Sequence, residues 1–229
     1  MPPTSERAPR VIAFAGSLRV DSNNKKLAWN MAVGAEAAGA EVRVLDLKQY
    51  PLPVYDADLY DARNGDPHAL HDAGQRVGPP HDRPMPEGLL RLKEHFRWAD
   101  GWLVATPEYS RRMPGMLKNA LDWLTRLAPG ESPLDNFTYK VVGLACAAYE
   151  GGGVSACQDL RGVLSGLECI VVPSSDVYVI AEDLFDAEGR LRDPAQRRRA
   201  EATGRRVVRI IRQLKGLGVD ADARLGARG

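Results

Sequence analysis

Short apolar runs alternate with helix-type patterns along most of the chain. Runs dominated by apolar residues at 11–15, 101–107, 140–147 and 169–173 predict buried strands, and the alternating stretch 41–47 predicts a strand nearer a sheet edge. The intervening segments have helical periodicity, with expected bounds of 23–38, 87–98, 116–127, 154–167 and 194–214. Strands separated by helices predict a parallel sheet covered on both faces, and right-handed crossovers restrict this to the doubly wound folds.

In a doubly wound fold a ligand binds beyond the carboxyl ends of the strands. Three loops follow predicted strands there, at 16–24, 107–115 and 147–154, and their composition is the most unusual of all the loops. We therefore expect the functional site among these three loops.

Segment 50–87 interrupts the regular alternation. It is rich in proline and holds three of the four histidines. A connection of this length is a surface loop without chemistry, a lid, or an arm that contacts a second subunit. We expect residues 10–218 to form one domain of a size that can bury a full core, with flexible ends at 1–9 and 219–229.

Composition narrows the class of protein. The 31 basic and 30 acidic residues give a net charge of +1, which offers no basic surplus for binding nucleic acid. The three cysteines form no CxxC pair, so a disulfide framework is not expected. The first ten residues lack the apolar run of a signal peptide, and no segment reaches the ~18 apolar residues of a membrane span. We expect a cytoplasmic protein without a membrane partner.

The loop after the first predicted strand has the composition of an anion site. Gly16 permits close approach of a ligand, and the following helix directs free N–H groups to the same point. Five side chains of this loop can donate hydrogen bonds to an anion: Ser17, Arg19, Ser22, Asn23 and Asn24. Neither GxxxxGK[ST] nor GxGxxG is present, which leaves a phosphomonoester such as that of FMN. Simple helix capping with a solvated Arg19 is the alternative.

The loop after the third strand can receive a planar ligand. Pro107 stops the strand, and Pro114 with Gly115 shapes the entry to the next helix. Between them the backbone of Glu108, Tyr109 and Ser110 is free to face a flavin, with Tyr109 or Met113 as apolar cover.

Two motifs make the chain resemble the NADPH-dependent FMN reductases. GSLRVDSNNKKLA at 16–28 is similar to the family pattern GSLRxxSxNxxLA, and TPEYSRRMPGMLKNALDW at 106–123 is similar to TPEYNxSxPGxLKNAxDW. The resemblance runs from about 10 to 177 and implies a flavodoxin-like sheet of order 2-1-3-4-5, bound FMN, and a homodimer or homotetramer. It implies phosphate contacts from Ser17, Arg19, Ser22 and Asn24. It implies isoalloxazine contacts from Pro107, Glu108, Tyr109 and Ser110.

The chain departs from the family pattern at several positions. Ser110 replaces the usual Asn, and Arg111 and Arg112 replace a small and polar pair. These arginines, with Tyr109, are candidates for the substrate side: they suit the charge of a reduced flavin or the phosphate of NADPH, or they are solvated. In the third loop Gly151 and Gly152 fit only the glycine end of the family pattern.

The sequence predicts an FMN-dependent NAD(P)H oxidoreductase. A hydride passes from NAD(P)H through flavin N5 to a small acceptor in a ping-pong reaction, and no catalytic side chain is required. Quinones, azo compounds, free flavin and metal oxyanions all remain possible acceptors. The alternatives are a flavodoxin-type electron carrier and a catalytically silent flavin-binding protein. No metal is expected, and we expect Trp123 and segment 50–87 at the subunit contact.

Overall fold

The computed structural model describes residues 7–56, 85–128, 131–149, 152–179 and 184–217. The expectations for the two chain ends and for most of segment 50–87, with its three histidines, lie outside these residues. The strands are β1 (Arg10–Ala15), β2 (Glu41–Leu45), β3 (Gly101–Ala105), β4 (Val141–Ala148) and β5 (Ile170–Val179). The helices are α1 (Asn23–Ala37), η1 (Leu47–Gln49), α3 (Glu87–Trp98), α4 (Gly115–Leu124), α5 (Val154–Gly166) and α6 (Pro194–Gly216).

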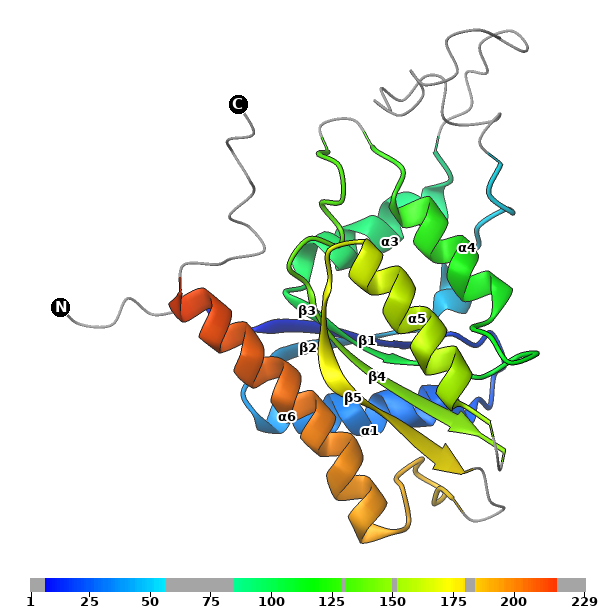
Figure 1. Cartoon of the computed structure of the whole chain (residues 1–229), viewed down its shortest axis with the longest axis vertical. Helices are drawn as coiled ribbons and strands as arrows, with labels where there is room; N and C mark the ends of the chain where they lie inside the picture. Colours follow the sequence, from blue (N-terminus) through cyan, green and yellow to red (C-terminus); the bar gives the residue numbers. More distant parts are fainter. Residues whose placement is uncertain (1–6, 57–84, 129–130, 150–151, 180–183, 218–229) are drawn as a thin grey trace, which may run out of the picture.

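The five strands form one parallel sheet in the order β2-β1-β3-β4-β5, which confirms the predicted flavodoxin-like arrangement (Figure 1). β1, β3 and β4 lie at its centre and are buried almost throughout, because helices cover both of their faces. The uninterrupted apolar runs of these three strands follow from that double burial.

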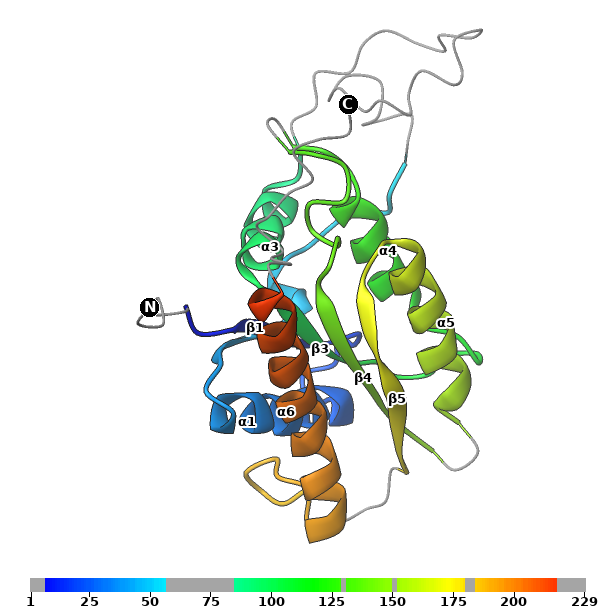
Figure 2. The same ribbon diagram turned by 60° about the vertical axis from the view of Figure 1, so that its left-hand side comes forward.

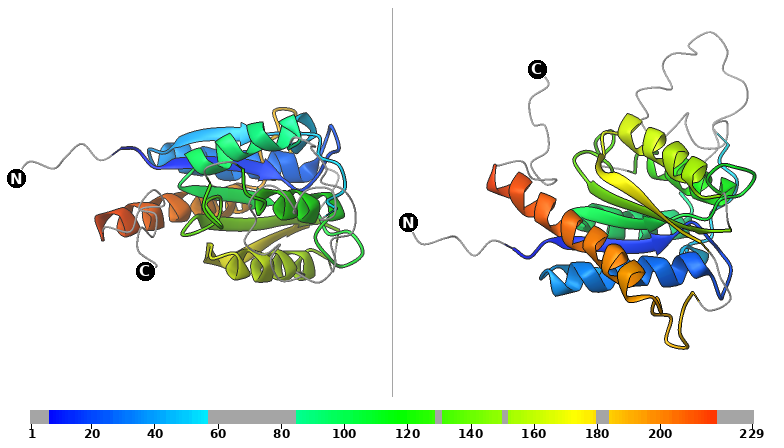
Figure 3. Two further views of the ribbon diagram at one scale, coloured as in Figure 1. Left: turned by 90° about the horizontal axis from the view of Figure 1, so that it is seen from above. Right: turned by 60° about the horizontal axis from the view of Figure 1, so that its bottom comes forward.

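Two helical layers enclose the sheet (Figures 2 and 3). One core cluster joins the sheet to α3, α4 and α5, and the other joins it to α1 and α6. Helices α1 and α6 cross closely at Gly34 and Gly204, where an added Cβ would lie 2.0 Å from the Glu201 carbonyl oxygen and 2.1 Å from that of Met31, respectively. A larger residue at either position would force these helices apart.

Strand β5 is longer than the sequence predicts. The predicted strand ends at Pro173, because a proline ordinarily stops a strand. In the structure β5 continues past Pro173 to Val179 on the edge of the sheet. The pairing with β4 shifts between Val142 and Leu144, and this bulge accommodates the proline.

None of the described helices is both long and apolar enough to cross a membrane.

Candidate functional site

The loops after β1, β3 and β4 meet at one edge of the sheet, because these strands are parallel neighbours. Two side chains join the loops directly. Asn24 contacts Ala147 at the end of β4, and Glu108 from the loop after β3 contacts Gly153 before α5. The three loops singled out by their composition therefore form one contiguous surface.

The loop after β1 holds several hydrogen-bond donors that have no partner among the residues the structure describes. Ser22 is the N-cap residue of α1, but its buried hydroxyl makes no cap hydrogen bond. The first hydrogen bond of the helix runs from the Lys26 N–H to the Ser22 carbonyl oxygen, so the N–H groups of residues 23–25 stay unused by the described chain. The exposed Arg19 guanidinium likewise has no hydrogen-bond or ion-pair partner among the described residues. Together these groups form a cradle for an anion.

Ser17 and Asn23 flank this cradle. Ser17 is buried and its hydroxyl oxygen lies 3.4 Å from the Arg19 N–H, which can donate to it. Asn23 is the first residue of α1 and is half-buried. Both residues therefore lie beside the unused donors of this loop.

The cations of the first helical turn are already neutralised. Lys25 pairs with Asp46 at 2.7 Å, and Lys26 pairs with Asp21 at 2.6 Å. The hydrogen bond from Lys26 holds the pKa of the Asp21 carboxyl below its usual range. Arg19 is therefore the free cation beside the cradle, within the described loop.

Asn24 differs from its expected role as a phosphate contact. Its Nδ2 donates to the Ala147 carbonyl oxygen at 3.0 Å, and its Oδ1 accepts from the Ala147 N–H at 2.8 Å. Both groups are buried. The side chain therefore holds the first turn of α1 against β4 and is not a phosphate donor, which leaves only the main-chain N–H of Asn24 for the cradle.

The loop after β3 is a tight hairpin. The main chains of Tyr109 and Arg112 exchange two hydrogen bonds of 3.0 Å, and Ser110 and Arg111 adopt left-handed φ values of 49° and 65°. The sequence predicts that the Tyr109 backbone faces the ligand. In the structure its N–H and carbonyl oxygen are both bonded to Arg112, so its N–H is not available to a ligand. The N–H groups of Glu108 and Ser110 have no partner among the described residues.

The side chains of this hairpin differ in their exposure to solvent. Tyr109 is half-exposed, while Arg111 and Arg112 are exposed and carry no ion pair within the described chain. Met113 is buried, as expected of apolar cover, and Pro107 is buried at the start of the loop.

The carboxylate of Glu108 contacts the third loop. Its Oε2 accepts hydrogen bonds from the Gly153 N–H at 2.8 Å and the Ala156 N–H at 3.3 Å. Gly152 closes a turn by donating its N–H to the Tyr149 carbonyl oxygen, so this N–H does not serve a ligand. Gly151 lies outside the described residues.

Asn119 and Trp123 of the second motif hold the chain that follows η1. The Pro53 carbonyl oxygen accepts from Asn119 Nδ2 at 2.9 Å and from Trp123 Nε1 at 2.8 Å, and the Tyr55 ring packs edge-on against Trp123. Trp123 is fully buried by its own chain. The expectation that it contacts a second subunit is therefore wrong, since no part of its side chain reaches the surface.

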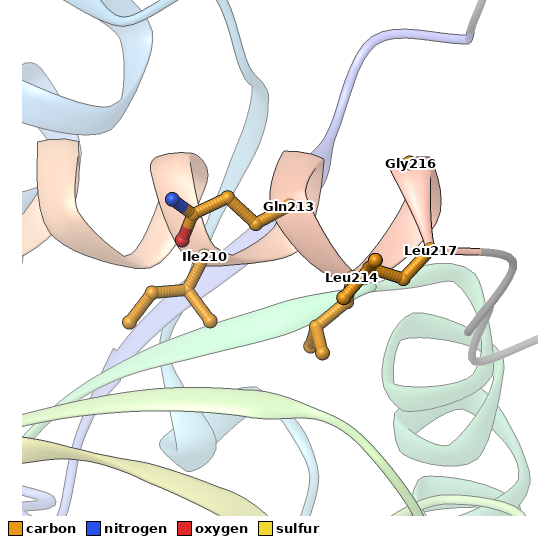
Figure 4. A pocket seen from close by; sticks show the side chains of 5 residues that line it. All are labelled: Ile210, Gln213, Leu214, Gly216 and Leu217. Atoms are coloured by element: carbon orange, nitrogen blue, oxygen red, sulfur yellow. The ribbon is translucent and has the colours of Figure 1, made fainter.

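Among the described residues, a cavity and a groove lie at opposite edges of the sheet. One of about 230 Å³ is bordered by Leu18 of the first loop, by residues 47–52 and by Met116 in the first turn of α4. The other is a shallow groove of about 440 Å³ along Ile210–Leu217 of α6 (Figure 4). Only the first adjoins the anion cradle.

Cys146 and Cys157 lie behind the third loop as a buried pair. The hydrogen bond between the two thiols and their burial raise the pKa of Cys146. A buried thiol with a raised pKa stays protonated at neutral pH, so Cys146 is unreactive.

The fold and the loops together define a flavodoxin-like protein whose loop after β1 has the donors of an anion site. The family model described as NADPH-dependent FMN reductase matches residues 9–182, and the chain belongs to this family. It is accordingly an oxidoreductase with FMN as cofactor and NAD(P)H as electron donor.

Similar proteins agree with this membership. The NAD(P)H-dependent FMN reductase PA1204 of Pseudomonas aeruginosa is 30% identical over 208 residues, which covers 90% of this chain and 97% of that protein. A 2-hydroxy-1,4-benzoquinone reductase from Burkholderia is 31% identical over 185 residues, covering 80% and 86%. The flavoenzyme FerB of Paracoccus denitrificans, an NAD(P)H:acceptor oxidoreductase, superposes with a TM-score of 0.65 at 26% identity, covering 90% and 98%.

The residues present fit FMN. A phosphate dianion requires several converging donors, and the buried Ser22 hydroxyl, the unused N–H groups of residues 23–25 and Arg19 supply them. The polar edge of the ring system requires main-chain donors, and Glu108 and Ser110 have theirs free within the described chain.

Proposed function

We propose that this chain is an FMN-dependent NAD(P)H oxidoreductase that reduces a small quinone. The observation that carries the proposal is the set of unpartnered donors along one edge, from Arg19 and the first turn of α1 to the hairpin after β3. The chemistry that FMN supplies when bound is acceptance of a hydride at N5 and its delivery to an acceptor, with the two substrates alternating in a ping-pong sequence.

The chain's own residues would bind and orient the reactants. Ser22, the N–H groups of residues 23–25 and Arg19 would hold the phosphate, and the N–H groups of Glu108 and Ser110 would hold the polar edge of the ring. Tyr109 would cover a ring face from its half-exposed position. The proton that, with the hydride, completes the hydroquinone can come from solvent, so no side chain is required as an acid or a base.

A quinone is the acceptor that the surroundings favour. The cavity of about 230 Å³ beside Leu18 and Met116 has a mostly apolar lining, which suits a planar organic ring better than an oxyanion. Relatives of this chain include a 2-hydroxy-1,4-benzoquinone reductase and a quinone reductase of Escherichia coli.

NADPH is the donor that the charges favour. Arg111 and Arg112 lie exposed at the tip of the hairpin, and no described carboxylate neutralises them. A guanidinium fork matches the 2′-phosphate that distinguishes NADPH from NADH.

We also propose that the chain forms a homodimer or a homotetramer. Large apolar side chains are exposed on the loops at the carboxyl edge of the sheet, at Leu18, Val20, Tyr109, Tyr149 and Val154. Such a patch beside the site suits coverage by a second copy of the chain. Light scattering on the eluted protein should give a mass of two or four times 25.0 kDa.

The test begins with the visible spectrum of the purified protein after addition of FMN. We expect stoichiometric flavin, bleaching on anaerobic mixing with NADPH, and recovery of the colour when a benzoquinone is added. Initial rates at several NADPH and quinone concentrations should give parallel double-reciprocal lines. Bound flavin without bleaching would favour an electron carrier, and absence of binding would refute the proposal.

A further inference from the structure

The hairpin after β3 is fastened to helix α5 at both of its ends. At the start of the hairpin, Glu108 Oε2 accepts hydrogen bonds from the N–H groups of Gly153 and Ala156 at 2.8 and 3.3 Å. At its end, the Met113 N–H donates to Asp159 Oδ2 at 3.2 Å. One carboxylate reaches from the loop to the helix and the other from the helix to the loop.

Glu108 acts as a cap that the helix itself lacks. The N-cap residue of α5 is Gly153, which has no side chain to offer and a φ of 97° that favours glycine. A carboxylate at this point also lies at the positive end of the helix dipole.

Asp159 holds the other end through the main chain. It lies in the second turn of α5, one turn beyond Ala156, so it faces the loop on the same side of the helix. Its partner is the N–H of the buried Met113.

The segment between the two anchors is strained. Ser110 and Arg111 both adopt left-handed φ values, which residues other than glycine rarely do. Such a turn persists only where its surroundings fix it. The two carboxylates and the hydrogen bonds between Tyr109 and Arg112 provide that restraint.

We propose that Glu108 and Asp159 are positioning residues that fix this hairpin so that the free N–H groups of Glu108 and Ser110 meet the polar edge of the flavin ring. The carboxylate of Glu108 is then a brace, while its main-chain N–H remains available to the ring. This inference rests on the proposed function, because it assigns the ring to this loop.

Asp159 is a better residue to substitute than Glu108, because its carboxylate accepts one hydrogen bond, from the Met113 N–H, and an Asp→Asn change keeps an oxygen that can accept it. D159N retains a side-chain oxygen for the Met113 N–H, whereas D159A has none. Q158A is the matched control, since Gln158 is an exposed neighbour on the same helix. If D159A does not fold, D159S takes its place.

The readouts are the FMN dissociation constant, the visible circular dichroism of the bound flavin and kcat against KM for NADPH. We expect D159A to weaken FMN by about five- to tenfold, the effect of one lost hydrogen bond to a group that orients the ligand, and to alter the flavin dichroism. We expect kcat to fall more than KM rises. D159N should restore most of each property, and Q158A should match the wild type.

Two results would overturn the inference. One is a D159A protein with unchanged dichroism, FMN affinity and kcat. The other is a D159A protein that only melts at a lower temperature while its flavin properties stay those of the wild type. Failure of the proposed function is distinguishable, because the wild type itself would then bind no FMN. Hydrogen exchange of the Met113 amide in the apoprotein, faster in D159A, would still report the brace.

Discussion

The amide of Asn24 makes a contact whose removal has a calculable effect. Its two hydrogen bonds satisfy both main-chain groups of Ala147, at 3.0 and 2.8 Å, and the side chain is buried. In N24A the N–H and carbonyl of Ala147 lose their partner in a place that water reaches poorly. An unsatisfied buried group costs about 1–3 kcal/mol, so we expect a loss of about 3 kcal/mol of unfolding free energy for the pair. For a domain of this size that lowers the melting temperature by about 6–12 °C.

The assay is thermal unfolding of the apoprotein, followed by circular dichroism, beside S22A. Ser22 is the N-cap residue, and its replacement by alanine ordinarily costs about 1 kcal/mol. Here the Ser22 hydroxyl makes no cap hydrogen bond, so S22A should leave the apoprotein within about 0.5 kcal/mol of the wild type. S22A should instead lower FMN affinity, because that hydroxyl is free for the phosphate.

The two variants should therefore show opposite patterns. N24A should lose apoprotein stability, and any loss of FMN affinity should follow from that instability. If N24A melts like the wild type without FMN and yet binds FMN poorly, Asn24 is a direct ligand and the structural assignment fails. Equal apoprotein destabilisation by S22A would show that its hydroxyl is already used within the fold.

Three further predictions concern other groups. R19A should weaken FMN by about tenfold in a fluorescence titration, because the unpaired guanidinium supplies a charge-assisted hydrogen bond, and R19K should recover only part; unchanged affinity would place Arg19 in solvent. K93M should lower the unfolding free energy by about 3 kcal/mol in urea melts, because Lys93 pairs with Glu131 at 2.5 Å in the interior, and an unchanged urea midpoint would refute this. Burial and the neighbouring Arg43 lower the pKa of His95 below its ordinary 6.5. As the pH falls below 6.5, the unfolded state takes up the proton before the folded state does, so the stability that neutral His95 contributes is lost. In H95Q the urea midpoint should therefore change less between pH 7.5 and 5.5 than in the wild type, and an equal change would refute this.

The strands and helices could be predicted because their signals are local. The buried strands β1, β3 and β4 appear as unbroken apolar runs, and α3 was expected at 87–98 with the bounds that the structure has. The extension of β5 could not be predicted, because Pro173 ends a strand in isolation and is tolerated only where the bulge opposite β4 receives it.

Which polar residues of the loops bond within the fold, and which stay available to a ligand, depends on contacts between residues far apart in the sequence. Asn24 and its partner Ala147 are 123 positions apart, and Glu108 and Gly153 are 45 apart. Composition marks both Asn24 and Glu108 as polar residues of a candidate loop, which is correct. It carries no sign that each is already bonded to another part of the chain. Asp159 gave no signal at all, because an aspartate in a helix is ordinarily a solvated residue.

The polar groups that the fold leaves unbonded identify the ligand more closely than the motifs do. In the second motif Asn119 and Trp123 bind Pro53, and Glu108 caps α5, so three of its polar groups serve the chain itself. The unused donors, by contrast, are clustered at the first turn of α1 and at the hairpin after β3. Converging N–H groups at a helix start, with a guanidinium beside them, form a site that an anionic ligand can complete. An anion at one end and a planar polar edge at the other are what those donors require, and a mononucleotide with a tricyclic ring has both.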